Sequence, residues 1–316
     1  MTAVAFGLLC LLLIGPVPEW LARAQWPMRA PRAAMTLWQA IALAAVLSAF
    51  SAGLAIAANL LRPGPAGSPT ASVHEQIARL GWPLWLFSVL ALAATLLVGA
   101  RLVVTALRVA FRTRERRAAH RQLVDLIATL DEPVVAQRHP LRARYVRRLA
   151  VDQPLAYCLP GRRRRVVVTD GAVQRLSDDE LRAVLAHERA HLRARHDLVI
   201  EAFIALQAAF PRFVRSSSAL GSVELLAEAL ADDQAVRTTS PTTLARALVA
   251  VSDATAPTGA MAAGGATTVA RIHRLAVPNS RRAAAAAYAA AAAILVIPTL
   301  AVAIPWLVEL SRFFGG

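Results

Sequence analysis

The chain of 316 residues is 57% hydrophobic, has a mean hydropathy of +0.48 and carries a formal net charge of +15. Soluble globular chains are about 45–50% apolar, so this excess predicts membrane-spanning segments and argues against a soluble secreted domain. Lysine is absent, which excludes P-loop nucleotide binding, Schiff-base chemistry and Ser-x-x-Lys acyl-enzyme chemistry, because each needs a lysine amine. The two cysteines, Cys10 and Cys158, cannot build a disulfide framework or a cysteine-rich zinc site.

Four apolar stretches are long enough to cross a bilayer core, which takes about 20 residues of α-helix. We expect membrane helices over about 2–20, 36–61 and 81–101, and a fourth within 283–316. Tryptophans near the ends of these stretches fit the aromatic belts of membrane interfaces. A signal peptide is the alternative for the first stretch, because Ala22-Arg23-Ala24 resembles a cleavage site, although no positive residue precedes the apolar run.

Arginines predict the orientation, since cytoplasmic loops carry the excess of positive charge. Arg23, Arg29 and Arg32 lie in the first loop, and a dense series of arginines follows the third stretch, whereas the loop 62–79 has arginine only at its edges. We therefore expect a multi-pass protein of the cell membrane with its N-terminus outside. Residues 1–111 form three membrane helices in this interpretation, 112–282 a cytoplasmic domain, and 283–316 a fourth membrane helix with a short outer tail.

The excess of arginine has two interpretations. The run Arg162–Arg165 is a candidate for nucleic-acid binding, but no nucleic-acid motif or interleaved aromatic residue accompanies it. Arginines beside membrane spans instead contact anionic lipid headgroups, at about 1 kcal/mol each. We expect membrane lipids as partners and no direct contact with nucleic acid.

The segment after the third stretch mixes helical and strand patterns. Helical spacing after residue 112 is broken at Asp131-Glu132-Pro133. Two short strands, Leu155–Leu159 and Arg164–Thr169, are expected to be joined by the turn residues Pro160-Gly161. The cytoplasmic domain is therefore expected to be α+β.

A capping box at Ser177–Glu180 predicts a helix that runs through about Ala194. This helix contains His187-Glu188-Arg189-Ala190-His191, the H-E-x-x-H pattern. The two histidines are about one turn apart, so both imidazoles project from one face and can bind one zinc ion. Glu188 lies beside them, where it can take a proton from zinc-bound water. The alternative is a pair of surface histidines on an amphipathic helix.

A catalytic zinc takes three protein ligands and keeps one position open. His196 lacks the spacing of the metzincin pattern, which also needs an intervening glycine. The gluzincin solution is a glutamate on a second helix, and Glu224 and Glu228 are both candidates on one face. We favour Glu228 because Asp232 follows one turn later and can accept a hydrogen bond from a ligand imidazole.

These residues resemble two groups of membrane zinc peptidases. The pairing of Glu228-x-x-Ala231-Asp232 with the H-E-x-x-H helix is similar to the E-x-x-A-D motif of Ste24/HtpX-like peptidases. The closer resemblance, over about 155–236, is to BlaR/MecR-type antirepressor peptidases, on the segments Leu159–Gly161, Val166–Val168 and Leu176–Leu181 followed by H-E-x-x-H. It implies a mainly α membrane protein of about four transmembrane helices with a cytoplasmic gluzincin-type zinc peptidase domain. It also implies one Zn²⁺ per chain and cleavage of a BlaI-type winged-helix repressor.

One departure from the BlaR/MecR pattern concerns the signal. Antibiotic-sensing members carry an extracellular penicillin-binding domain after the last span, whereas this sequence has eight residues after Val308 and no lysine. We therefore expect no direct β-lactam sensing through such a domain.

The expected mechanism is peptide hydrolysis at a zinc held by His187, His191 and Glu228, with Glu188 as the general base. The oxyanion that forms needs a second donor. Tyr157, Arg237 and His273 are the candidates, and the sequence does not choose among them. The predicted strand at Arg164–Val168 is a candidate for aligning substrate by strand addition.

Three further segments complete the prediction. The apolar run Leu198–Phe210 is expected to be a buried helix packed on the zinc helices, or alternatively one that enters the membrane face. Ser240-Pro241 predicts the start of another helix, and Ala254–Ala270 reads as a flexible linker.

The leading hypothesis is an integral-membrane zinc endopeptidase that cleaves a cytoplasmic repressor in a signalling pathway. The alternatives are an HtpX-like protease for quality control of membrane proteins and a non-catalytic zinc-bound membrane receptor. A transporter is disfavoured because the apolar stretches have no charged residue at mid-membrane depth. The sequence leaves open whether the chain forms a homo-oligomer.

Overall fold

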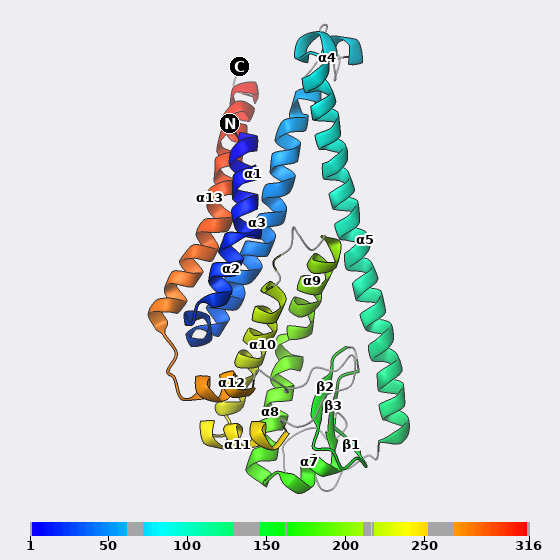
Figure 1. Cartoon of the computed structure of the whole chain (residues 1–316), viewed down its shortest axis with the longest axis vertical. Coiled ribbons are helices and arrows are strands. Elements are labelled where there is room, and N and C mark those ends of the chain that lie inside the picture. The colour runs from blue at the N-terminus through cyan, green and yellow to red at the C-terminus, as the bar shows by residue number, and fades with distance from the viewer. Residues whose placement is uncertain are drawn as a thin grey trace.

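The computed structural model describes residues 2–61, 72–128, 146–161, 163–210, 216, 218–251 and 268–314. Among these, four helical stretches are long and apolar enough to cross a membrane: Thr2–Arg23, Pro31–Leu60, Trp82–Ile127 and Arg281–Leu300. They coincide with the four apolar stretches expected from the sequence. The two chain ends lie at the same end of the molecule, and the small sheet lies at the other (Figure 1).

Three of the long helices form one bundle. Both α1 (Thr2–Ile14) and α13 (Arg281–Phe314) pack against α3 (Pro31–Ala57). The short helices α2 (Pro16–Arg23) and η1 (Trp26–Arg29) connect α1 to α3. Alanine-rich surfaces allow this close packing, and the fully buried Trp38 fills the space between α3 and its neighbours.

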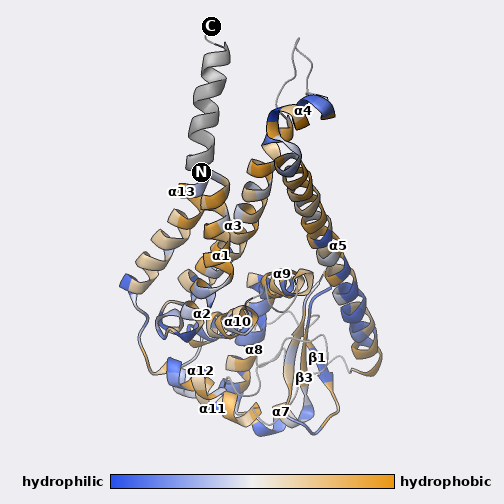
Figure 2. Ribbon diagram, turned by 45° about the horizontal axis from the view of Figure 1, so that its top comes forward, coloured by the Kyte–Doolittle hydropathy of each residue, from blue (hydrophilic) through white to orange (hydrophobic). Residues whose placement is uncertain are grey.

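The fourth long helix, α5 (Trp82–Ile127), forms a hairpin with α3. The segment 62–79, expected as a loop, overlaps the helix α4 (Val73–Leu80), which begins at a capping box between Ser72 and Glu75. The predicted boundary between 111 and 112 lies inside α5, because the helix continues without interruption through the arginine-rich stretch (Figure 2). The helix α5 thus connects the predicted membrane segment 81–101 without a break to the arginine-rich segment that follows it.

Two shorter helices lie between the diverging arms of this hairpin (Figure 1). The helix α9 (His196–Ala209) packs against α5, and α10 (Ala219–Val236) packs against α3 and α9. Arg101 of α5 donates a hydrogen bond to the carbonyl of Ala209 at the end of α9. The helix α9, which contains most of the apolar run expected as a buried helix, therefore contacts the long helix α5. It also contacts the two helices that carry the H-E-x-x-H and E-x-x-A-D motifs.

The sheet has three strands in the order β1-β3-β2. The strands β2 (Ala156–Leu159) and β3 (Arg165–Thr169) are antiparallel and confirm the two predicted strands. The parallel strand β1 (Val146–Leu149) was not predicted, because the arginines in Val-Arg-Arg-Leu hide its strand pattern. The predicted break at Asp131-Glu132-Pro133 lies outside the described residues.

The two faces of the sheet contact different helices. Cys158 and the side chains on the same face pack with α8 (Asp178–Ala194), α7 (Asp170–Arg175) and α11 (Pro241–Val251). The alternate residue Tyr157 faces Val124 of α5. This alternation, which follows from the period of two in a strand, decides which side chains of β2 can reach the helix with the H-E-x-x-H motif.

Candidate metal centre

The H-E-x-x-H helix is α8, and its predicted boundaries are confirmed. Ser177 and Glu180 form the reciprocal capping box, and the helix ends at Ala194. His187 and His191 are each about 2% exposed. Their Nε2 atoms lie 3.1 Å apart, so the spacing of four residues brings both imidazoles to one point.

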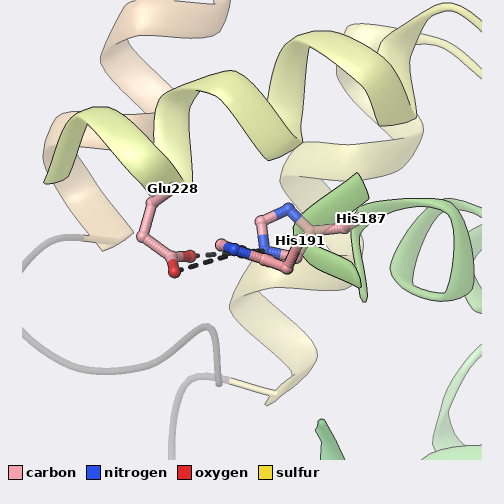
Figure 3. A group of neighbouring side chains, drawn as sticks. All are labelled: His187, His191 and Glu228. Carbon is pink, nitrogen blue, oxygen red and sulfur yellow. Dashed lines mark hydrogen bonds and ion pairs between the residues drawn. The ribbon is translucent and has the colours of Figure 1, made fainter. Parts of the chain in front are cut away.

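Glu228 of α10 completes this group. Its two carboxylate oxygens lie 3.3 Å from His187 Nε2 and 3.3 Å from His191 Nε2. Donor atoms of the three residues lie within 4.8 Å of one another, and they form a group that can hold a metal ion (Figure 3). Glu224, the rival ligand, lies exposed one turn earlier on α10 and does not belong to the group.

The donor set and its spacing fit zinc. Zn²⁺ binds imidazole nitrogens and carboxylate oxygens at about 2.0–2.2 Å in a tetrahedron, which places neighbouring ligand atoms about 3.3–3.5 Å apart. The two Nε2 atoms lie 3.1 Å apart, and each lies 3.3 Å from one of the two Glu228 carboxylate oxygens. Burial alone would lower the pKa of His187, but hydrogen bonds with Asp232 and Glu228 raise it to about 9. The electrostatic field at this point therefore favours a cation.

The far nitrogens of both imidazoles have partners that orient the rings. Asp232 Oδ1, completely buried, lies 2.9 Å from His187 Nδ1. His196 Nδ1, at the start of α9, lies 3.1 Å from His191 Nδ1. Burial and the neighbouring His191 lower the pKa of His196 to about 4, so His196 is neutral and its Nδ1 can accept a hydrogen bond from the Nδ1–H of His191. Each Nε2 lone pair is then free to face the metal position.

A buried arginine contacts two of the acidic residues of α10, Asp232 and Glu228. Arg271 of α12 (Thr268–Leu275) is 0% exposed and donates to Asp232 through Nη2 at 2.6 Å and through Nε at 2.9 Å. Its Nη1 lies 3.0 Å from Glu228 Oε2, an ion-pair contact. Burial opposes ionisation of Asp232, but the hydrogen bonds from Arg271 and His187 outweigh it and lower the pKa. Arg271 thus helps to keep Asp232 ionised, whereas hydrogen bonds from His187 and His191 outweigh burial and lower the pKa of Glu228.

Glu188 has a different environment from the other acidic residues. It is 1% exposed, and among the described residues neither carboxylate oxygen has a nitrogen or oxygen hydrogen-bond partner. Burial raises its pKa to about 8, with a smaller contribution from the charge of Glu228, while the charge of His187 and then the adjacent Cys158 thiol act in the opposite direction. A carboxylate held beside a metal position with a pKa near neutrality suits a group that accepts and returns a proton.

The three residues expected to supply an oxyanion donor do not meet at this group. Tyr157 is on the sheet face that contacts α5, where its hydroxyl lies 3.0 Å from His120 Nε2, and burial raises its pKa to about 12. Arg237 is exposed after the end of α10, and His273 is exposed on α12, two residues after Arg271. Of the described residues, the cationic side chain that touches Glu228 is Arg271.

Sequence reasoning missed two residues that touch the ligands, Arg271 and His196. Nothing in the sequence distinguishes Arg271 from the many other arginines, since its contact with Asp232 joins positions 39 residues apart. His196 was considered only as a third ligand, for which its spacing is wrong. Its position five residues after His191 was the available signal for a contact through the other ring nitrogen.

Two buried histidines and a glutamate on neighbouring helices, with a second glutamate inside the H-E-x-x-H motif, define the class of zinc metallopeptidases. The sequence profile of peptidase family M48 matches residues 120–295, more than half of the chain, and the chain belongs to this family. Membership implies a zinc-dependent hydrolase with a protein substrate, and it supports the membrane-peptidase part of the resemblance noted above. No curated protein and no solved structure matched the chain.

Proposed function

We propose that the protein is a membrane-bound zinc endopeptidase with its active centre on the cytoplasmic side. The observation that carries this proposal is the convergence of His187 Nε2, His191 Nε2 and the Glu228 carboxylate beside Glu188, which is buried with no nitrogen or oxygen partner in the part of the chain that the structure describes. A purely structural zinc site would close the fourth position and would need no base. The arginines that follow the third apolar stretch support the cytoplasmic placement.

His187, His191 and Glu228 would hold the metal. When bound, zinc lowers the pKa of a water molecule and polarises the peptide carbonyl. Glu188 accepts the proton of the attacking water and returns it to the leaving amine as the carbon–nitrogen bond breaks. Asp232 and His196 hold the two imidazoles, and Arg271 holds Asp232 and Glu228. The chain's own residues thus fix the ligands and move the proton.

The sheet suggests how a substrate is aligned, and it corrects one expectation. The strand proposed for substrate addition, Arg164–Val168, corresponds to β3, which is central and paired on both sides. A strand in that position has no free edge to offer. Within the described part of the sheet, β2 is the edge strand that packs against α8. We therefore propose that an extended substrate pairs with the outer edge of β2.

Two substrate classes remain in competition for this site. The resemblance to BlaR/MecR-type peptidases over about 155–236 favours a BlaI-type winged-helix repressor. Membership of family M48 is equally compatible with an HtpX-like role in clearing damaged membrane proteins. Both use the same centre, so the substrate separates them.

The test uses the full chain purified in detergent with one equivalent of zinc. It is incubated in parallel with a winged-helix repressor and with an unfolded membrane protein, and Glu188→Gln serves as the inactive counterpart. We expect wild type to cleave at least one substrate and Glu188→Gln to lose about 10²–10⁴ of the rate while it still binds zinc. Glu224→Gln is the matched control and should keep both zinc and activity, whereas Glu228→Gln should lose both.

Each outcome decides something. Cleavage of the repressor alone supports the signalling role, and broad cleavage of unfolded membrane proteins supports quality control. Zinc binding without cleavage of any protein would contradict the peptidase proposal and favour a zinc-bound receptor. Activity of Glu188→Gln near the wild-type rate would disprove the mechanism.

A further inference from the structure

An apolar cavity of about 310 Å³ lies between α1, α3, α5, α9 and the start of α10. Its walls are aliphatic and aromatic side chains, among them Trp38, Val98, Phe203 and Phe210, and its few polar lining residues are Gln207 and Ser216. We propose that this cavity binds one acyl chain of an anionic phospholipid, with the lipid phosphate at Arg101. The inference concerns a site separate from the metal centre and does not depend on the proposed function.

The lining of the cavity extends along the predicted membrane helices. On α3 it runs from Trp38 to Ala49, which is about 16 Å at a rise of 1.5 Å per residue. A helix with side chains is about 10–12 Å in diameter and needs far more room over that length than a cavity of about 310 Å³ offers. The cavity is therefore too small for a helical segment of a substrate or of a second copy. A single hydrocarbon chain suits its limited volume and its apolar lining.

A charged side chain near the cavity indicates the lipid class. Arg101 lies one helical turn after Val98 on α5, and its side chain is exposed apart from the hydrogen bond to Ala209. Ala209 directly precedes Phe210, which lines the cavity. A cationic side chain beside an opening between membrane helices is suited to an anionic headgroup.

The depth of Arg101 agrees with this assignment. Arg101 is 19 residues after Trp82, where α5 begins, so the two are about 28 Å apart along the helix. That distance matches the hydrocarbon core of a bilayer, about 30 Å. With Trp82 and its stacked neighbour Trp85 at one interface, Arg101 lies at the height of the opposite headgroups. A lipid phosphate at Arg101 would thus lie at headgroup depth and one helical turn from Val98 of the cavity lining.

The test measures lipid binding to the delipidated full chain in detergent, by native mass spectrometry and by the lipid-dependent shift in thermal midpoint. The probes are phosphatidylglycerol and phosphatidylcholine with identical acyl chains. We expect wild type to prefer phosphatidylglycerol about fivefold. Arg101→Gln should abolish this preference, and Arg101→Lys should retain it. Arg108→Gln, an exposed arginine two turns further along α5, is the matched control and should behave as wild type.

Filling the cavity tests the acyl chain. Ala45→Phe places a ring among the lining residues and should weaken binding of both lipids at least about tenfold. Ala42→Phe, at another lining position, serves if the first variant does not fold. Unchanged lipid binding in a folded cavity-filling variant would overturn the proposal. Equal losses of the phosphatidylglycerol preference in Arg101→Gln and Arg108→Gln would also overturn the proposal, since they would indicate general surface attraction. Capture of a transmembrane peptide in preference to either lipid would overturn it as well.

Discussion

The metal centre and the α3–α5 hairpin are both tightly packed, but different forces hold them. At the metal centre, buried charges are arranged in pairs, with Arg271 against Asp232 and Glu228. In the hairpin, small residues allow close contact, with Gly53 against Thr95 and Gly99 against Phe50. The first region therefore depends on matched charge and the second on matched shape. Substitutions that remove a charge or add a methyl group should separate the two.

The largest effect is expected at the metal centre, from Arg271→Gln. Loss of the guanidinium leaves Asp232 buried without its cation, and breaking a buried ion pair in this way costs about 3–5 kcal/mol of unfolding free energy. Zinc affinity should fall as well, because Glu228 and His187 lose a neighbour that fixes their positions. Denaturant unfolding in detergent and a zinc titration measure the two effects.

Arg237→Gln is the control for that substitution, since Arg237 is exposed and its loss should change stability by no more than about 0.5 kcal/mol. Arg271→Lys should be intermediate, because an ammonium keeps the charge but not the fork of donors. Equal stability of Arg271→Gln and wild type would show that Asp232 and Glu228 do not need the guanidinium.

A second effect at the metal centre should come from His196→Ala. This change removes the group that lies 3.1 Å from His191 Nδ1, so the ring loses its orientation. Zinc affinity should fall about 10–100-fold, with the fold retained, as measured by competition with a chromogenic chelator and by circular dichroism. Wild-type affinity would mean that packing alone orients His191.

In the hairpin, Gly53→Ala should destabilise through shape alone. A Cβ at this position would lie 1.9 Å from Thr95 Oγ1 and 3.1 Å from Thr95 Cβ, and Thr95 is held by its hydrogen bond to Ala91. Overpacking of this kind costs about 1–3 kcal/mol. Gly7→Ala is the matched control, since no atom lies within 4 Å of its added Cβ. A thermal midpoint in detergent that is equal for the two variants would contradict the shape argument.

Local sequence patterns predicted the part of the metal centre that lies on α8 and α10. The capping box, the H-E-x-x-H spacing and the Glu228–Asp232 spacing all lie within single helices, where a period of 3.6 residues determines which side chains share a face. The four apolar stretches were equally readable, because each is a continuous run of span length. These features depend on neighbours in the sequence.

The features that the sequence did not predict depend on tertiary packing. Arg271 reaches Asp232 only because α12 packs on α10, and no local signal marks it among so many arginines. The position of the Tyr157 side chain is determined by strand alternation, which places it on the sheet face away from α8. Likewise, β3 cannot accept a substrate strand because the unpredicted β1 covers its second edge.

The smallest expected effect lies at Arg195, which connects α8 to α9 and so sets His196 against His191. Arg195 has φ 54° and ψ 43°, a left-handed conformation that costs an L-residue about 1–2 kcal/mol. Arg195→Gly removes that strain but adds backbone entropy to the unfolded chain, so we expect a net gain below about 1 kcal/mol. Arg195→Val should lose stability instead, since a β-branched residue tolerates positive φ poorly. Denaturant unfolding compares the two. Because the Arg195 side chain is exposed, a loss in both variants would show that its guanidinium, rather than the backbone, stabilises this junction.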